Sequence, residues 1–235
     1  MRETQKTQPR AAEVQAANLP DNLPLAPFEK TVRNALENCT DVDSLLFEND
    51  ELSGCNGVYL EFSGCLFRHC TFSDWEFKRI SFVDCVLEQC DLSGLRLENV
   101  TFQRIRVTDC RLLGAEMLKA VFKAVFSNVL WHGCNADYLA FSESKCTRVE
   151  FTECRFHEST WQDITLKATV FDHCDFTSST IRHMPLAGLN LTTCVLDSLQ
   201  IDPFDLRGLK VTPLQGLAFC SLLGLVITDA PIEKE

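Results

Sequence analysis

An apolar residue recurs at every fifth position through most of this chain, and no other feature constrains the fold as strongly. Steps of five lead from Phe62 to Phe122, and after one four-residue step to Phe126 they continue to Val211. All 31 of these centres are apolar, although only 46% of the chain is hydrophobic. A period of five matches neither the 3.6 of a helix nor the 2.0 of a strand, so the chain must turn a corner in every repeat.

The residues around each centre indicate which side chains are buried. Two positions before the centre, 27 of 31 residues are apolar, and we expect the four polar exceptions to face inward as well: Ser144, Ser159, Thr169 and Ser179. The residues directly before and after each centre are mostly polar. Each repeat therefore places two side chains in a core and presents the others to solvent.

Several repeats resemble the motif of the pentapeptide repeat proteins: a small residue, a polar residue, Leu or Phe, and two more polar residues. The matching stretches include CTFSD from Cys70, CDLSG from Cys90 and CDFTS from Cys174. The resemblance covers roughly residues 60–211. It implies an all-β solenoid, a right-handed quadrilateral β-helix in which four repeats make one coil of about twenty residues.

A coil of twenty residues assigns side chains to columns that run along the solenoid. We expect one column of Cys134, Cys154, Cys174 and Cys194, a second of Cys70, Cys90 and Cys110, and a third of Cys65 and Cys85. The expected ladder of large side chains is Phe62, Phe82, Phe102, Phe122, Phe141 and Trp161, continued by Ile181 and Ile201. The four-residue step at Phe122 is interpreted as a local tightening, with no insertion between Phe62 and Val211.

Cysteines close to histidines raise the question of a metal site. His157 and His173 fall at outward positions, whereas Cys154 and Cys174 point inward, so neighbours in sequence cannot share a tetrahedral ion. A disulfide between adjacent coils is the alternative, but parallel side chains and a reducing compartment disfavour it. We expect small buried fillers of low reactivity, with no metal and no cofactor.

The two ends of the chain depart from the repeat. Residues 1–27 are expected to form a flexible arm, and residues 28–59 an N-terminal cap with irregular first repeats. A helix over 28–38 would bury Phe28, Val32 and Leu36. The solenoid is expected over 60–211 and a C-terminal helix, cap and dimerisation segment over 212–235. Thr212, Pro213 and Gln215 form a helix start signal, and Gly224 is expected to end the helix.

The C-terminal helix carries more apolar residues than one solenoid end requires. It is either a lid alone or a lid that also forms a two-fold interface, and gyrase-protecting relatives have a similar arrangement. We expect a homodimer. The candidate dimerisation residues are Leu214, Leu217, Phe219, Leu222 and Leu223.

The charge pattern suggests a candidate partner surface. The net charge is −11, but residues 61–211 carry 20 acidic and 16 basic side chains. By the coil spacing, one face of the later coils holds the candidate acidic residues Asp137, Glu158, Asp175 and Asp197, with Arg155 as its only base. The middle coils are instead basic, through Arg104, Arg106, Arg111, Lys119 and Lys123.

Motifs for catalysis, such as phosphate loops, GxSxG and HExxH, are missing from the sequence. We therefore expect a non-enzymatic solenoid that binds a protein. The alternative implied by the resemblance is a DNA mimic that binds a bacterial type II topoisomerase, DNA gyrase or topoisomerase IV, and modulates quinolone sensitivity. The absence of a signal sequence and of a long apolar segment predicts a cytoplasmic protein without membrane contact. The net negative charge disfavours direct nucleic-acid binding.

Overall fold

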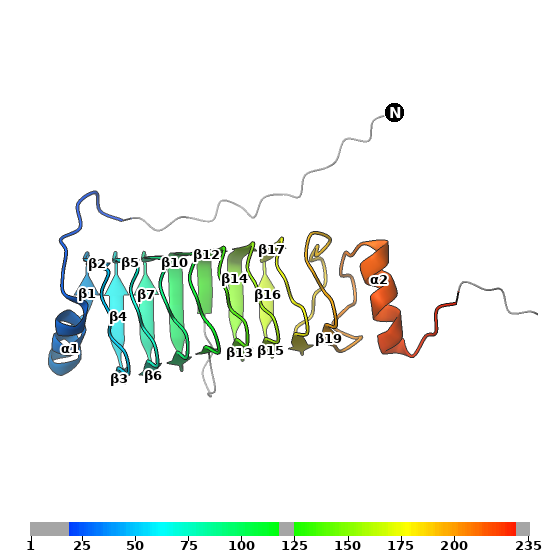
Figure 1. Cartoon of the computed structure of the whole chain (residues 1–235), viewed down its shortest axis with the longest axis horizontal. Helices are drawn as coiled ribbons and strands as arrows, with labels where there is room; N and C mark the ends of the chain where they lie inside the picture. Colours follow the sequence, from blue (N-terminus) through cyan, green and yellow to red (C-terminus); the bar gives the residue numbers. More distant parts are fainter. Residues whose placement is uncertain (1–18, 118–124, 229–235) are drawn as a thin grey trace, which may run out of the picture.

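A computed structural model describes residues 19–117 and 125–228 of the chain. The described residues form an elongated rod of stacked coils, with one helix at each end (Figure 1). All strand pairs are parallel, and each strand pairs with its counterpart in the neighbouring coil. The fold is a right-handed β-solenoid with four-sided coils, as the resemblance to pentapeptide repeat proteins implies.

The first helix and the strands of the N-terminal half are α1 (Phe28–Asn38), β1 (Val42–Asp43), β2 (Leu46–Glu48), β3 (Asn56–Gly57), β4 (Leu60–Ser63), β5 (Leu66–Arg68), β6 (Glu76–Phe77), β7 (Ile80–Val83), β8 (Val86–Glu88), β9 (Arg96–Leu97), β10 (Val100–Thr108) and β11 (Glu116–Met117). The elements of the C-terminal half are β12 (Val125–His132), β13 (Ala140–Ser142), β14 (Lys145–Thr152), β15 (Thr160–Gln162), β16 (Thr165–Lys167), β17 (Val170–Asp172), β18 (Thr180–Arg182), β19 (Gln200–Ile201), α2 (Pro213–Cys220) and the 3₁₀ helix η1 (Ser221–Leu223).

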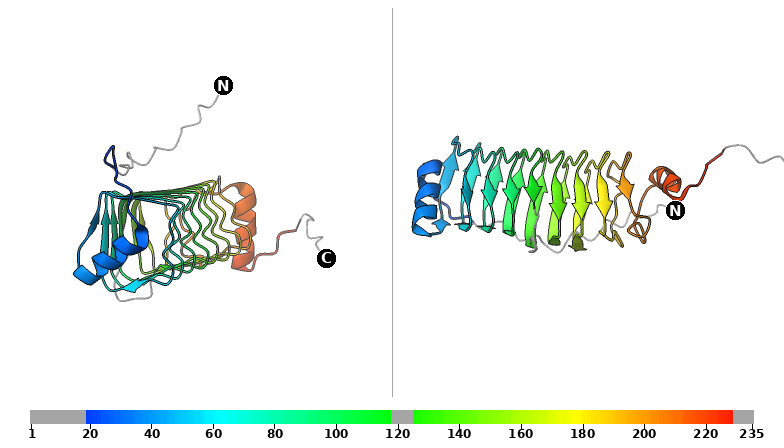
Figure 2. Two further views of the ribbon diagram at one scale, coloured as in Figure 1. Left: turned by 60° about the vertical axis from the view of Figure 1, so that its left-hand side comes forward. Right: turned by 90° about the horizontal axis from the view of Figure 1, so that it is seen from below.

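Each coil has four sides, one per five-residue repeat, and the coils stack in register along the rod (Figure 2). Side 1, which includes β4 and β7, and side 2, which includes β5 and β8, join into an 11-stranded sheet, because β10, β12 and β14 continue around the corner between them. Side 4 is an 8-stranded sheet that runs from β3 to β19. Side 3 has no strands among the described residues. It is held by single bridges between successive coils, at Glu51, Thr71, Asp91, Arg111, Asn135, Arg155, Asp175 and Val195.

The corners of the coils explain how a five-residue repeat closes into a square. One corner column consists of His69, Gln89, Asp109, Gly133 and Glu153, and every member has a positive φ between 51° and 63°. Such left-handed backbone is unfavourable for most residues. Here the N–H group of each corner residue bonds to the next coil, as in the 2.9 Å bond from Gln89 to the carbonyl of Thr108. The coil-to-coil bonds thus fix a conformation that the side chains alone do not favour.

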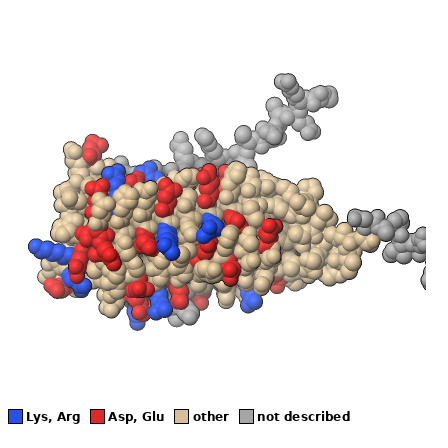
Figure 3. Space-filling model, viewed as in Figure 1, with Lys and Arg blue, Asp and Glu red and all other residues tan. Residues whose placement is uncertain are grey.

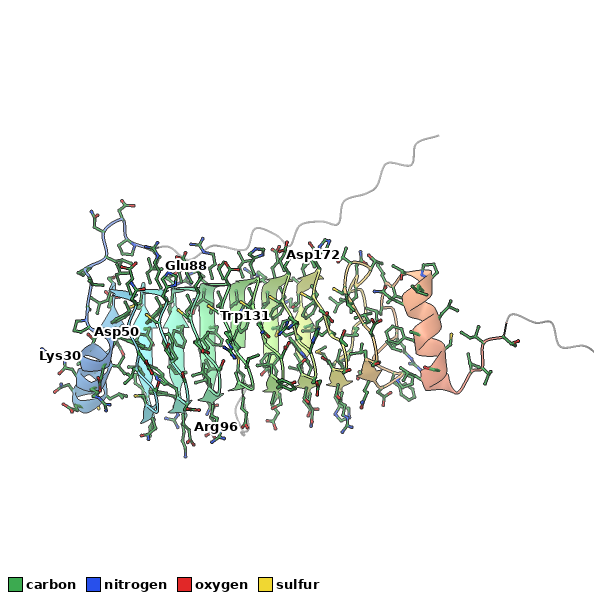
Figure 4. The ribbon with its side chains drawn as sticks, in the orientation of Figure 1. Lys30, Asp50, Glu88, Arg96, Trp131 and Asp172 are labelled. Carbon is green, nitrogen blue, oxygen red and sulfur yellow. The ribbon has the colours of Figure 1, made fainter. Side chains whose placement is uncertain are left out.

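The interior of the rod is filled by the two inward side chains of each repeat. Aromatic rings stack between coils, as for Phe62 on Phe82 with centroids 5.2 Å apart. Trp131 also lies inside the rod, between the outer edges that carry Glu88 and Arg96 (Figure 4). The four polar residues expected to face inward are all buried: Ser144, Ser159, Thr169 and Ser179. Their hydroxyls are hydrogen-bonded, for example from Ser144 to the carbonyl of Ser142 at 2.6 Å.

The register of the middle coils corrects one sequence-based interpretation. Phe82 pairs with Phe102, twenty positions on, but Phe102 pairs with Phe126, twenty-four positions on. Likewise Met117 pairs with Phe141. The interpretation of a tightened coil without an insertion was therefore wrong, because this coil contains four additional residues between β11 and β12. Phe122 lies outside the described residues, and Phe141 follows Met117 rather than Phe122.

The same correction merges two of the predicted cysteine columns. Cys110 and Cys134 are neighbours, because Arg111 and Asn135, the residues that follow them, form a bridge. A single column therefore runs along the rod through Cys70, Cys90, Cys110, Cys134, Cys154, Cys174 and Cys194. The expected ladder is likewise divided between two sides. Phe62, Phe82, Phe102 and Phe126 lie on side 1, and Phe77, Leu97, Met117, Phe141, Trp161, Ile181 and Ile201 lie on side 4.

The N-terminal end of the rod is covered by α1. The helix spans Phe28–Asn38, as the sequence predicts, and buries Phe28, Val32 and Ala35, with Leu36 partly buried. The residues Pro24 and Ala26, which precede this helix, form backbone hydrogen bonds with Leu46 and cover the edge of the first coil. The solenoid itself begins at Val42. Gly57 interrupts the apolar frame because Leu36 of α1 and Phe77 occupy the space that its side chain would need.

Candidate interaction surfaces

The helix α2 closes the C-terminal end of the rod, and the start signal that the sequence predicts determines where this helix begins. The hydroxyl of Thr212 accepts a hydrogen bond from the N–H of Gln215, and the Gln215 side chain accepts one from the N–H of Thr212. The amide of Gln215 also donates to the carbonyls of Leu191 and Cys194, at 2.9 and 2.7 Å. One side chain therefore caps the helix and anchors it to the last coils. Gly224, with φ of 70°, ends η1, which continues α2.

The outer surface of this end is apolar. Of the five candidate dimerisation residues, Leu214 is 79% exposed, and Leu217 and Leu222 are also exposed. Phe219 is instead half-buried and packs against the core, and the side chain of Leu223 lies outside the described ones. Figure 3 shows that the C-terminal end of the rod is free of charged side chains in this view. The exposed leucines form an apolar patch at the end of the molecule.

Sequence reasoning did not single out the apolar residues that extend this patch. After Gly224, the side chains of Leu225, Val226 and Ile227 are exposed. Phe204, in the last coil, is exposed too, and the Arg207 guanidinium lies 5.0 Å from the centre of its ring. For Leu225, Val226 and Ile227, the apolar run from Leu214 to Ile227 in the sequence was the available indication. Phe204 stands two positions before the centre Leu206, so the repeat pattern predicted that it is buried, and its 71% exposure shows that this prediction was wrong.

The four candidate acidic residues do lie on side 3 or at the corner after it. Asp175 belongs to the bridge column of side 3, and Asp137 lies next to the bridge residue Asn135. Glu158 and Asp197 are exposed and follow on later coils. Their relative placement follows from the coil spacing and does not depend on the insertion, since all four lie after it.

Two of these carboxylates are engaged within the molecule. Asp137 is only 7% exposed. Its oxygens accept hydrogen bonds from Nε and Nη2 of Arg155, at 2.9 and 2.6 Å, and from the N–H of His157 at 3.2 Å. The bond to Asp137 raises the pKa of Arg155. Asp175 lies 2.8 Å from Nε2 of His157. Asp137 is therefore paired with a cation and Asp175 is hydrogen-bonded within the molecule, whereas Glu158 and Asp197 are exposed.

The basic middle coils are also partly neutralised. Arg104 binds Asp84 of the preceding coil through two hydrogen bonds, of 2.7 and 2.5 Å, and the pKa of Arg104 is raised by this bond. Arg106 lies 3.7 Å from Glu88, which also accepts a 2.9 Å hydrogen bond from Arg68. Charges of both signs are interspersed along the rod (Figure 3). Lys119 and Lys123 lie outside the described residues.

The cysteine column has the character of a core element. The thiols of Cys90, Cys110 and Cys174 point inward, and each lies 3.4 to 3.6 Å from a backbone carbonyl oxygen. The sulfur of Cys110 also accepts a hydrogen bond from the backbone N–H of Cys90, at 3.3 Å. Outside this column, burial also raises the pKa of the thiol of Cys146, which occupies a centre position. Over residues 19–117 and 125–228, no group of three or more His, Cys, Asp or Glu side chains could hold a metal ion. Neither helix in these ranges is long and apolar enough to cross a membrane.

The comparisons with known proteins agree with the coil geometry. The family model described as "Pentapeptide repeat region" matches residues 60–129. This segment is a pentapeptide repeat region. The match extends across the extra residues of the middle coil, and the coils on either side of it continue the same bridge pattern without a break. No curated protein matches the chain.

Solved structures similar to this chain include a fluoroquinolone resistance protein and two pentapeptide repeat proteins. A trypsin-treated variant of QnrB1, a plasmid-mediated fluoroquinolone resistance protein, is 20% identical with a TM-score of 0.45, covering 80% of this chain and 90% of that one. HetL, a pentapeptide repeat protein involved in heterocyst differentiation regulation from Nostoc sp. strain PCC 7120, is 13% identical with a TM-score of 0.37, covering 72% and 87%. Rfr23 from Cyanothece 51142 is 10% identical with a TM-score of 0.33, covering 79% and 99%.

Proposed function

We propose that this chain is a non-enzymatic, protein-binding rod that acts in the cytoplasm as a homodimer. The observation that carries the proposal is the contrast between a filled interior and regular outer faces. The internal cavity beside Trp131 has a volume of about 20 Å³, which leaves room for about one water molecule. A small substrate needs a pocket of several hundred Å³ that excludes water. The sides of the rod are instead suited to contacts with another macromolecule.

The apolar C-terminal end supports the homodimer. Exposed leucines on α2 and η1 would be covered if two rods met end to end about a two-fold axis. Size-exclusion chromatography with light scattering tests this directly. We expect a dimer at micromolar concentration and a monomer for the double variant Leu214→Glu, Leu217→Glu. Val58→Glu, which changes an exposed apolar residue near the other end, should remain a dimer. A monomeric wild-type protein would contradict the proposal.

The second candidate function is a DNA mimic that binds a type II topoisomerase, either DNA gyrase or topoisomerase IV. The net charge of −11 and the rod shape favour it. Asp137 and Asp175 are both engaged within the molecule, which leaves fewer free carboxylates for a DNA mimic and favours generic protein binding as the first candidate.

The two candidates are separated by one assay. Purified DNA gyrase is tested for supercoiling while this protein is titrated, with and without a fluoroquinolone. Inhibition alone would indicate topoisomerase binding, and restored supercoiling in the presence of the drug would indicate protection. No effect at tens of micromolar would exclude the DNA-mimic candidate. An affinity purification with the intact rod as bait, and the monomeric double variant as control, would then identify the protein partner.

A further inference from the structure

The last strand of side 4 leaves one edge of the 8-stranded sheet open. β19 pairs with β18 on one side, and no strand of the described residues pairs with its other side. In each earlier coil of side 4, the carbonyl just before the strand accepts a hydrogen bond from the next coil, as Ser179 does from the N–H of Gln200 at 2.8 Å. Leu199 holds the equivalent position in the last coil, and no donor within residues 19–117 and 125–228 bonds to its carbonyl.

The C-terminal cap completes side 3 but not side 4. On side 3, the carbonyl of Cys174 accepts a hydrogen bond from the N–H of Val195 at 2.9 Å. In the last coil the side-chain amide of Gln215 supplies this donor instead, because it bonds to the carbonyl of Cys194 at 2.7 Å. No described group of α2 or η1 does the same for Leu199. An open strand edge presents unpaired backbone groups that can take up a further strand.

A segment suited to be that strand follows the cap. Leu225, Val226 and Ile227 are 56%, 89% and 55% exposed and belong to no helix or strand. Valine and isoleucine are among the residues most enriched in strands. The N–H of Leu225 donates to the carbonyl of Cys220 at 3.1 Å, and beyond this bond the chain leads away from its own rod (Figure 1). Three consecutive apolar side chains are therefore left in solvent by a single copy of the protein.

The exposed segment begins close to the open edge. Leu222 of η1, three residues before Leu225, lines a pocket of about 410 Å³ whose other lining residues belong to β18 and β19 or directly follow them. In an end-to-end homodimer, the C-terminal ends of two rods face each other. Three extended residues span about 10 Å, roughly twice the distance of about 4.8 Å between neighbouring strands. The segment of one copy would thus be long enough to lie along the edge of the other.

We propose that Leu225–Ile227 of each copy adds as a strand to the open edge of β19 in the other copy. The inference rests on the proposed homodimer, whose two-fold symmetry makes the exchange reciprocal. Each added strand supplies backbone N–H groups to an edge that ends at the unpaired carbonyl of Leu199. It also removes its own apolar side chains from solvent by packing them against the end of the partner rod.

A second copy of this chain accounts for more of the structure than other occupants of the edge do. A strand from an unrelated protein would pair with β19 but would leave Leu225–Ile227 exposed. Addition of the segment to its own rod would require the chain to reverse after η1, whereas the described chain leads away from the rod (Figure 1). Exchange between two copies pairs the open edge and covers the exposed segment, and it does both twice in each dimer.

Disulfide cross-linking between two versions of the full-length chain tests the exchange. Both versions carry Cys39→Ser and Cys220→Ser, because these are the cysteines of the described ranges that are not buried. One version also carries Gln200→Cys and a mass tag, and the other carries a single cysteine at one position of 225–227. Side chains alternate along a strand, and facing Cβ atoms of adjacent strands lie within disulfide range. We therefore expect cross-links between chains for the middle position alone or for the two outer positions alone.

Asn56→Cys, in place of Gln200→Cys, is the matched control. Asn56 holds the same outward position on β3, at the opposite edge of the same sheet, and should give no cross-link. The dissociation constant of the dimer, measured by analytical ultracentrifugation, is a second readout. The double variant Val226→Pro, Ile227→Pro removes two successive N–H groups, of which one faces the edge, and should raise this constant about tenfold. Val226→Thr with Ile227→Val keeps both N–H groups and should change it by less than twofold.

The other outcomes separate this inference from the proposed homodimer. A dimer that gives no cross-link, or gives equal cross-links at all three positions, would leave the homodimer intact and exclude strand exchange. A monomeric wild-type protein would exclude both. A disulfide that forms only within one chain, when that chain carries both cysteines, would assign the segment to the edge of its own rod.

Discussion

The carboxylate of Asp50 accepts a 2.7 Å hydrogen bond from the backbone N–H of Phe28, the first residue of α1 (Figure 4). In every later coil the equivalent position is an inward cysteine, beginning with Cys70. In the first coil there is no earlier coil to pack against, and an acidic residue there satisfies a free N–H of the capping helix. The residue preceding the helix, Pro27, makes no capping bond through its side chain. Asp50 therefore replaces the missing local cap.

Substitution of Asp50 tests this attachment of the cap. Asp50→Ala leaves the N–H of Phe28 without a partner, and we expect the free energy of unfolding to fall by about 1 to 2 kcal/mol. Asp50→Asn keeps an acceptor but loses the charge, so its effect should be smaller. Urea denaturation measures both. Asp43→Ala, an exposed carboxylate of the same coil, is the control and should change stability by less than about 0.5 kcal/mol. Equal effects at Asp43 and Asp50 would contradict the capping role.

Gly57 tests the packing between α1 and the first coils. A Cβ at this position would lie 2.7 Å from the Phe77 ring and 2.9 Å from Leu36. Because an aromatic ring in a packed core moves little, Gly57→Ala should reduce the free energy of unfolding by about 1 to 3 kcal/mol. Gly216→Ala in α2 is the matched control. Its nearest neighbour would be 3.9 Å away, and alanine is the better helix former, so this variant should gain up to about 1 kcal/mol. A neutral Gly57→Ala would mean that α1 is not seated on Phe77.

The fold was predictable from the sequence because the five-residue period repeats many times, so that local exceptions such as Gly57 do not obscure it. The insertion was missed for a specific reason. Phe122 is apolar and falls five positions after Met117, so the apolar count continues into the extra residues and needs only one four-residue step to reach Phe126. The cysteines carried the missing signal. Cys110 and Cys134 are twenty-four positions apart, whereas their neighbours in the column are separated by twenty.

The candidate surfaces were less predictable, because exposure and pairing depend on contacts between coils. The sequence indicated that Asp137 lies on side 3, but its burial depends on the reach of Arg155 from the next coil. Position alone did not reveal that Phe219 turns toward the core while Leu214 faces outward.

The pairing of Asp175 with His157 predicts a loss of stability in acid. Burial of Asp175 opposes ionisation, but hydrogen bonds from Thr177 and His157 outweigh it and lower the pKa of this carboxyl. A depressed pKa in the folded state stabilises the fold at pH above the unfolded value of about 3.9, and this contribution is lost as the pH falls through the folded pKa. We expect Asp175→Asn to lower stability at pH 6 and to lower it progressively less as the pH falls below about 3.9.

Chemical denaturation at a series of pH values between about 6 and 3 measures this difference. Asp197→Asn, which removes an exposed carboxylate from the same side of the rod, is the control and should shift stability little at either end of the range. A constant difference between Asp175→Asn and the wild-type protein at all pH values would show that the substitution acts through packing, and not through the charge of Asp175.

Phe156 is the sharpest test of the core register in the later coils, beyond the insertion. Its ring is fully buried, and its centroid lies 5.7 Å from that of Phe151, 5.1 Å from that of Trp161 and 5.2 Å from that of Phe176. Phe156→Ala removes this ring from a cluster that cannot collapse around the space, because the backbone is held by coil-to-coil hydrogen bonds. The free energy of unfolding should fall by about 3 to 5 kcal/mol, and Phe156→Leu should lose less than half as much. Thermal and urea unfolding measure both variants. A cost below about 1 kcal/mol for Phe156→Ala would mean that this position faces solvent, and that the register assigned to the coils after the insertion is incorrect.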